Sequence, residues 1–252
     1  MTVSSQTKDQ HPSALSTVLT PIHAAGYPFI GGAAVLTLIM AVLWLPLGLL
    51  GLVVTLWVVY FFRDPVRTIP EDDRLILSPA DGRVQSITQA PLPPELMGEE
   101  AAGQNGDGGP EPTLTRISIF LNIFDVHVNR IPVGGHVDKV VYTPGKFVNA
   151  ALDKASVDNE RSSFQITTRD GRRVIVTQIA GLVARRIICD VKSGQGVQAG
   201  GRFGLIRFGS RVDVYLPPDA VPRVCIGQRA IGGETVLADL ASERPPWRAR
   251  RE

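Results

Sequence analysis

The segment from Ala24 to Phe62 reads AAGYPFIGGAAVLTLIMAVLWLPLGLLGLVVTLWVVYFF, and none of its 39 residues is charged. Twenty of these residues are Leu, Ile, Val or Phe, and together they favour transfer into a bilayer by about 6 to 12 kcal/mol. A single straight helix of this length would measure about 58 Å, nearly twice the roughly 30 Å hydrocarbon core. We therefore expect residues 24–62 to form a membrane-associated hairpin of two short helices, over roughly 27–45 and 48–62.

Pro46, Gly48 and Gly51 interrupt the run near its middle. A proline inside a helix removes a backbone donor and clashes with the preceding turn, so the break is expected here. Each helix is short for a full span, and a shallow re-entrant hairpin fits the sequence equally well. A cleaved signal peptide is the competing interpretation, but the apolar run is too long for its hydrophobic region and no basic cluster precedes it.

Basic residues are distributed unevenly about this run, since Lys8 is the only Lys or Arg before it. The arginines that follow it closely are Arg63, Arg67 and Arg74. By the positive-inside rule, this bias predicts that the large C-terminal part lies on the cytoplasmic side of the cell (inner) membrane. Residues 1–23 are expected to be a flexible N-terminal segment. Residues 241–252 form a basic tail that either contacts anionic headgroups or stays in solvent.

The composition restricts the remaining function classes. The chain has 26 Lys+Arg against 24 Asp+Glu, a net charge of +2, which argues against nucleic acid as its main partner. Its two cysteines, Cys189 and Cys225, have neither metal-ligand nor redox spacing, so we expect reduced core thiols and no metal site.

Residues 63–240 are predicted to form one β-rich domain. Residues 115–121 alternate, with Ile117 on the same face as Ile119 and Leu121. Residues 164–168 and 173–179 flank Asp170 and Gly171, a dipeptide suited to a hairpin turn. Short strands with frequent Gly and Pro indicate a sandwich or barrel, and therefore a mainly β (α+β) fold behind the helical hairpin.

Two glycine-punctuated segments, residues 78–84 and 191–217, are typical of hybrid barrel-sandwich domains such as biotinyl and lipoyl carriers. Those carriers display a lysine at the hairpin tip, where this chain offers Gly209 and Ser210. A swinging-arm role therefore loses its reactive group. Residues 91–113 are rich in proline and acidic residues without periodicity, which predicts a surface loop.

Few residues are suited to acid and base chemistry near neutral pH. His11 and His23 precede the membrane segment, which leaves His127 and His136, and His136 is expected to be exposed in a turn. His127 follows a predicted strand and is either a structural hydrogen-bonding group or a catalytic acid and base. Asp81, in SPADG, is either catalytic or a turn residue that caps its own backbone.

Short motifs occur in one order along the chain: FFRDP at 61–65, SPADG at 78–82, DVH at 125–127, YTPG at 142–145 and RFGS at 207–210. None is specific alone, but in this register the chain resembles the phosphatidylserine decarboxylase family from about residue 60 to residue 240. Its short, membrane-anchored bacterial branch is the most similar.

The resemblance implies a self-processing proenzyme. Self-cleavage between Gly209 and Ser210 would leave a large β fragment and a small α fragment, and it would convert Ser210 into a covalent pyruvoyl cofactor. That group would form a Schiff base with phosphatidylserine in the membrane and release CO2 and phosphatidylethanolamine, without pyridoxal phosphate or a metal. His127 is the expected proton donor, and Asp81 is expected to assist self-cleavage.

Two departures from the family pattern matter. The long-form enzymes have LGST at the cleavage site, whereas this chain has FGS followed by Arg211. A second histidine, three residues after the first, is Arg130 here, so the base that activates Ser210 stays open. Arg130 is instead a candidate ligand for the lipid phosphate or carboxylate. Homo-oligomerisation also stays open.

Two other functions are compatible with the same residues. One is a membrane-anchored serine hydrolase that uses Ser210, His127 and Asp81 as a triad. The other is a non-enzymatic, carrier-like β module tethered to a membrane assembly. Both predict a single uncut chain.

Overall fold

The computed structural model of the chain describes residues 20–97, 113–145, 158–181, 186–207, 209–241 and 245–246. The chain divides into two compact units, Met1–Val66 and Arg67–Glu252. Most of the predicted segments 1–23 and 241–252 lies outside the described residues, as do residues 98–112 of the predicted loop. These domain boundaries stay predictions.

The first unit contains the predicted helical hairpin. A short 3-10 helix, η1 (Ala24–Gly26), leads into α2 (Tyr27–Leu43), and α3 (Leu45–Phe61) follows after the extended residue Trp44. The chain therefore turns at Trp44 and not at the residues that we expected to interrupt it. Pro46 lies in the first turn of α3, where its missing N–H costs nothing.

Gly48 and Gly51 have a different role from the predicted helix breakers, because both are buried inside α3. A Cβ atom at Gly48 would lie 2.4 Å from the Cβ of Ala41, and one at Gly51 would lie 2.9 Å from Oγ1 of Thr37. The hydroxyls of Thr37 and Thr55 are 2.9 Å apart and join the two helices. Small residues thus allow α2 and α3 to pack closely, as in membrane helix pairs.

The two ends of the hairpin meet. The backbone N–H of His23 donates to the carbonyl of Phe62 (2.8 Å), and the rings of Phe29 and Phe62 stack 5.4 Å apart. The remaining surface of both helices exposes mainly Leu, Val and Ile. The segment Ala24–Leu43 is long and apolar enough to cross a membrane, whereas α3 is shorter. Such a surface fits insertion into lipid from one side.

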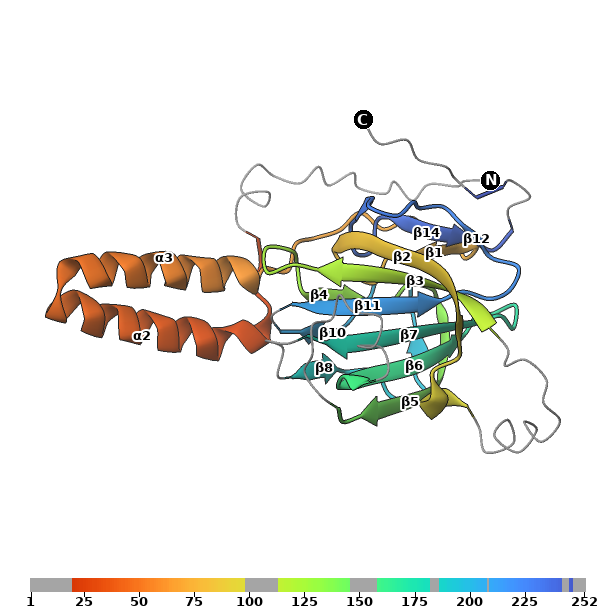
Figure 1. Ribbon diagram of the computed structural model, residues 1–252, viewed down its shortest axis with the longest axis horizontal. Helices are drawn as coiled ribbons and strands as arrows, with labels where there is room; N and C mark the ends of the chain where they lie inside the picture. Colours follow the sequence, from red (N-terminus) through yellow and green to blue (C-terminus); the bar gives the residue numbers. More distant parts are fainter. Residues whose placement is uncertain are drawn as a thin grey trace, which may run out of the picture. The chain divides into compact units, whose positions relative to one another are not determined.

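The second unit is mainly β, as predicted (Figure 1). Its strands are β1 (Leu75–Leu77), β2 (Gly82–Pro91), β3 (Thr113–Leu121), β4 (Val128–Arg130), β5 (Gly135–Thr143), β6 (Arg161–Thr167), β7 (Arg173–Ala180), β8 (Ile187–Cys189), β9 (Gly196–Val197), β10 (Arg202–Ile206), β11 (Ser210–Tyr215), β12 (Val221–Pro222), β13 (Arg229–Ala230) and β14 (Val236–Asp239). A 3-10 turn, η2 (Pro94–Leu96), follows β2 within the predicted loop 91–113.

The strands form three antiparallel sheets. The large sheet has the order β13-β2-β3-β11-β7-β6-β5-β9, and it curves strongly in Figure 1. Two smaller sheets have the orders β4-β10-β8 and β1-β14-β12. One hydrophobic core, which includes Phe164, Phe203 and Val212, joins residues from all three sheets.

The strand pattern read from the sequence is confirmed where it was clearest. Ile117, Ile119 and Leu121 on β3 are all fully buried on one face. The hairpin between β6 and β7 turns at the predicted dipeptide, with Gly171 at a φ of +85°.

Strand β11 is buried on both faces, which its alternating sequence did not indicate. Val212 and Val214 enter the main core. On the opposite face, Tyr215 packs in a second cluster that includes Leu92 and Leu96, at the edges of η2. This strand is therefore the most enclosed part of the sheet.

Gly82 is placed where β2 and β3 approach too closely for a side chain. A Cβ atom there would lie 2.2 Å from the carbonyl oxygen of Phe120, which is backbone and cannot move aside. We expect Gly82→Ala to lower the free energy of unfolding by about 1 to 3 kcal/mol, because the two strands must separate. Urea unfolding of the full chain in detergent measures this change.

The matched control is Gly196→Ala on β9, where a Cβ atom would meet nothing within 4 Å. This control should change the free energy of unfolding by less than about 0.5 kcal/mol. Equal effects of the two substitutions would contradict the close approach at Gly82.

Candidate functional site

The predicted site residues gather at one end of the large sheet, which we call the Ser210 end. In the strand register, Ser210 at the start of β11 pairs with Leu121 at the end of β3 and with Ala180 at the end of β7. Strand β2 begins beside this point, since Arg83 pairs with Phe120. The loops that follow β3 and precede β2 therefore open at the same end as Ser210.

The peptide bond between Gly209 and Ser210 joins two sheets, because β10 belongs to a small sheet and β11 to the large one. Gly209 has a φ of +69°, in the left-handed region. Other L-residues adopt this conformation only at a cost of about 1 to 2 kcal/mol. The surrounding space is open, since a Cβ atom would meet nothing within 4 Å. Backbone conformation, and not lack of room, is thus what favours glycine here.

The Ser210 side chain is fully buried. Within the part of the chain that the structure describes, its Oγ makes no hydrogen bond. A buried hydroxyl without a partner costs about 1 to 3 kcal/mol, so such a group calls for an explanation. A reactive role is one.

His127 is also fully buried, and it lies next to the strand that leads into this bond. The backbone N–H of Ile206, at the end of β10, donates to the backbone carbonyl of His127 over 3.4 Å. Its ring Nδ1 lies 2.9 Å from the carbonyl oxygen of Asp125. Because a carbonyl only accepts, we assign a proton to Nδ1, so Nε2 is the ring nitrogen whose protonation can change.

Asp81 does not cap its own backbone, which was the structural alternative. Ser78 makes the local turn contact instead, since its hydroxyl donates to the carbonyl of Ala80 (2.7 Å). The Asp81 carboxylate accepts two hydrogen bonds from Arg67, at 2.8 and 2.9 Å, and one from the backbone N–H of Gly232 at 2.8 Å. The partner Arg67 was not found from the sequence, because nothing local links the two residues.

The pKa of Asp81 lies above its ordinary value despite this ion pair. Burial of the carboxylate is the largest cause, the Arg67 guanidinium opposes it, and the nearby Asp125 adds to the rise. By register, Asp81 lies beyond β3 from Ser210, about two strand spacings of roughly 4.8 Å away. The structure thus brings Asp81 to the same end as Ser210 but not beside it.

Arg130 lies at the far end of β4 from His127, and it is buried. Its guanidinium donates to the carbonyl of Gly200 at 3.0 Å, and its backbone N–H donates to the carbonyl of Pro79. These contacts join β4 to the loop before β10 and to the SPADG segment. A role in binding substrate stays a prediction.

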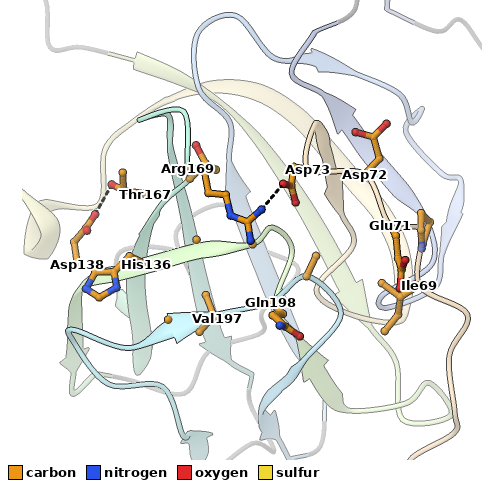
Figure 2. A pocket seen from close by; sticks show the side chains of 16 residues that line it. Ile69, Glu71, Asp72, Asp73, His136, Asp138, Thr167, Arg169, Val197 and Gln198 are labelled. Atoms are coloured by element: carbon orange, nitrogen blue, oxygen red, sulfur yellow. Dashed lines mark hydrogen bonds and ion pairs between the residues drawn. The ribbon is translucent and has the colours of Figure 1, made fainter. Parts of the chain in front are cut away.

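A pocket of about 1190 Å³ lies at the opposite end of the sheet (Figure 2). Its lining includes His136, which is exposed as expected, and the ion pair of Arg169 with Asp73 at 3.0 Å. Strand β6, whose 7 residues span roughly 20 Å, runs from the Ser210 end to this pocket. None of the predicted catalytic residues lines it.

The remaining predictions concern the cysteines and a metal site. Cys189 and Cys225 form no disulfide and are half-buried instead of lying in the core, and burial raises the pKa of the Cys189 thiol. Among the described residues, no group of three or more His, Cys, Asp or Glu side chains lies together as a metal site would require.

Large apolar side chains are exposed near the Ser210 end. Within the described residues of the second unit, the exposed large hydrophobic residues are Ile123, Phe124, Tyr142 and Ile226. Ile123 and Phe124 lie in the loop between β3 and His127, and Tyr142 is next to the last residue of β5. Exposed apolar side chains of this kind mark surfaces that contact other apolar molecules.

Residues 54–238 match the family model of phosphatidylserine decarboxylase. The chain belongs to this family. It is 54% identical over 228 residues to the phosphatidylserine decarboxylase proenzyme of Cereibacter sphaeroides, which covers 90% of this chain and 94% of the relative. It is 52% identical over 233 residues to the proenzyme of the same name from Beijerinckia indica, with 92% and 95% covered.

The Arg67 contact predicts how Asp81 titrates in this member of the phosphatidylserine decarboxylase family. Replacing Arg67 with Met removes a cause that lowers the Asp81 pKa and leaves burial unopposed, so the Asp81 pKa should rise further. A larger fraction of Asp81 is then protonated at any given pH. Carboxyl-carbon NMR of the full chain in micelles, with labelled aspartate, measures the titration.

Arg74→Met is the matched control, because the exposed Arg74 pairs with Asp72 and not with Asp81. It should leave the Asp81 titration unchanged. If Arg67→Met also leaves it unchanged, the ion pair does not control this carboxylate.

Proposed function

We propose that the chain decarboxylates phosphatidylserine to phosphatidylethanolamine and CO2 with a pyruvoyl group that it makes from its own Ser210. Membership of the phosphatidylserine decarboxylase family supports the reaction. The observation that carries the self-processing step is the junction of β10 and β11, where a left-handed Gly209 precedes a buried Ser210.

Self-cleavage uses only groups of this chain and one water molecule. The Ser210 Oγ attacks the carbonyl carbon of Gly209, its proton passes to a base, and the amide nitrogen leaves as the amine of residue 210. The product is an ester. Loss of the Ser210 Cα proton then expels the Gly209 carboxylate, and water replaces the nitrogen of the resulting enamine, which departs as ammonia. The left-handed Gly209 favours the first step, because the chain bends sharply there without a side chain.

His127 and Asp81 divide the proton transfers. His127 adjoins the strand that leads to the scissile bond, and in this proposal its Nε2 exchanges the substrate proton. Asp81, which lies beyond β3, assists self-cleavage through an intervening group and not by direct contact. Its raised pKa places it closer to the range in which a carboxylate exchanges protons.

The residues at this position fit the group that the family name implies, because Ser210 is its precursor and already lies enclosed. The pyruvoyl group supplies a ketone that draws electrons from the amine-bearing carbon of the substrate as CO2 leaves. Strand β11 holds residue 210 between β3 and β7 and shields it from water. His127 returns a proton to the substrate carbon.

The membrane is the place of reaction in this proposal. The apolar hairpin anchors the chain, and the arginines after it favour the cytoplasmic side of the inner membrane. The exposed Ile123 and Phe124 would meet the leaflet that contains the substrate. After cleavage, the partners are the two fragments of one chain, residues 1–209 and 210–252.

Replacing Ser210 with Ala removes the attacking hydroxyl, so both self-cleavage and CO2 release should be abolished. The wild type should give two fragments on a denaturing gel, and the smaller one should have a blocked N-terminus that reacts with hydrazine. Mass spectrometry and release of labelled CO2 measure both results. Ser118→Ala, a buried serine on β3, is the control and should still be cleaved and active.

An uncut wild-type chain that reacts with a serine-directed phosphonate would favour the anchored serine hydrolase. An uncut chain without a reactive carbonyl would favour the carrier-like module. Decarboxylation by the Ser210→Ala variant would show that the site is misassigned.

His127→Ala separates the two proton transfers. Because His127 is assigned to the substrate proton, turnover should fall by about 100-fold or more, while the two fragments still form. Densitometry of the fragments and CO2 release by the cleaved enzyme give the two rates. His136→Ala, at the other end of the sheet, is the control. If the fragments no longer form, His127 is needed for self-cleavage. If turnover is unchanged, His127 has no role in catalysis.

A further inference from the structure

Two arginines oppose each other across the strands that lead into the cleavage site. Strands β10 and β8 pair in register up to Ile206 opposite Ile187. The next residues beyond this ladder are Arg207 and Arg186, which its register would place across from each other if continued, and the charge of Arg186 does act on Arg207. Like charges in this position destabilise a strand pair.

The surroundings of the pair increase this cost. Burial lowers the pKa of Arg207, and the charge of Arg186 lowers it further. Arg186 is exposed, and its charge also acts on the Tyr142 hydroxyl, which is hydrogen-bonded to Glu160. Among the described residues, no ion pair is found between Arg186 and a carboxylate. A bound anion would relieve the repulsion of the two guanidinium groups.

We propose that Arg186 and Arg207 form an anion subsite that binds the phosphodiester of the substrate headgroup. Arg207 lies three residues before Ser210, and the phosphate of phosphatidylserine is only a few bonds from the amine that reacts there. Guanidinium groups bind phosphate oxygens with paired, charge-assisted hydrogen bonds. The inference rests on the proposed function for the identity of the substrate.

The carboxylate is the less suitable ligand for this pair. It must leave as neutral CO2, and two cations beside it would stabilise the charged ground state and slow the reaction. The phosphodiester keeps its charge throughout the reaction, so binding it does not change the activation free energy of the chemical steps. The subsite therefore positions the headgroup.

Anion binding can be tested without activity, in the uncut Ser210→Ala chain. Glycerophosphoserine and inorganic phosphate are titrated by calorimetry against the full chain in detergent, at an ionic strength matched with sodium chloride. Arg186→Gln and Arg207→Gln, each added to this background, should weaken binding of glycerophosphoserine about tenfold or more. Arg173→Gln, which removes an exposed charge at the other end of the sheet, is the control and should bind normally.

Kinetics then separate phosphate from carboxylate in the cleaved enzyme. Arg186→Gln should lower kcat/KM for phosphatidylserine about tenfold or more, mainly through KM. An O-alkylserine, which keeps the amine and carboxylate but lacks phosphate, should be turned over equally by the wild type and the variant. Arg186 is the primary variant, because a change at Arg207 also alters the approach to the scissile bond.

Several results would overturn the subsite. Equal losses with the two substrates would show that the pair does not contact phosphate. Binding of inorganic phosphate but not of glycerophosphoserine would reveal only an adventitious anion site, and unchanged binding in both variants would remove the site altogether. A wild type that binds glycerophosphoserine but releases no CO2 would leave the subsite intact and refute the proposed function.

Discussion

The enclosed position of strand β11 is the constraint on which the rest of the second unit depends. The strand is hydrogen-bonded on both sides, by β3 and β7, from its first residue to its last. The bond before Ser210 is also where the chain leaves the small sheet for the large one. Each side of this bond is therefore held by its own neighbours: β10 by β4 and β8, and β11 by β3 and β7. A cut between residues 209 and 210 would remove one covalent link and leave both ladders in place.

The charged residues on the outer face of β11 pair within the strand itself. Arg211 and Asp213 are almost completely buried and pair with each other, with an N–O distance of 2.8 Å. A buried ion pair seldom adds stability, because both groups lose their hydration. Burial and the charge of Asp213 raise the pKa of Tyr215 to about 12, so this phenol stays neutral. Since the two charged partners lie in one strand, a cut before Ser210 would not separate them.

The sequence predicted those features that depend on neighbouring residues. The uncharged run predicts the hairpin, the alternation of Ile117, Ile119 and Leu121 predicts β3, and Asp170-Gly171 predicts the turn between β6 and β7. The turn at Trp44 was missed because proline is tolerated in the first turn of a helix, so Pro46 begins α3 instead of ending α2. Gly48 and Gly51 allow close packing, which depends on the facing helix and is invisible in a local pattern.

The candidate site likewise has features that the sequence predicts and features that it does not. The Gly209-Ser210 pair, His127 and Asp81 are recognisable from motifs, but their mutual positions follow from strand register. The pairing of Asp81 with Arg67, and the opposition of Arg186 and Arg207, arise from contacts distant in sequence. The consequence reaches beyond single residues, because the two ends of the large sheet differ in character. The lining of the pocket includes Glu71, Asp72, Asp73 and Asp138 against Arg169, whereas the Ser210 end has the exposed apolar side chains Ile123 and Phe124. The sequence does not indicate this difference, because strand register decides which residues meet at each end.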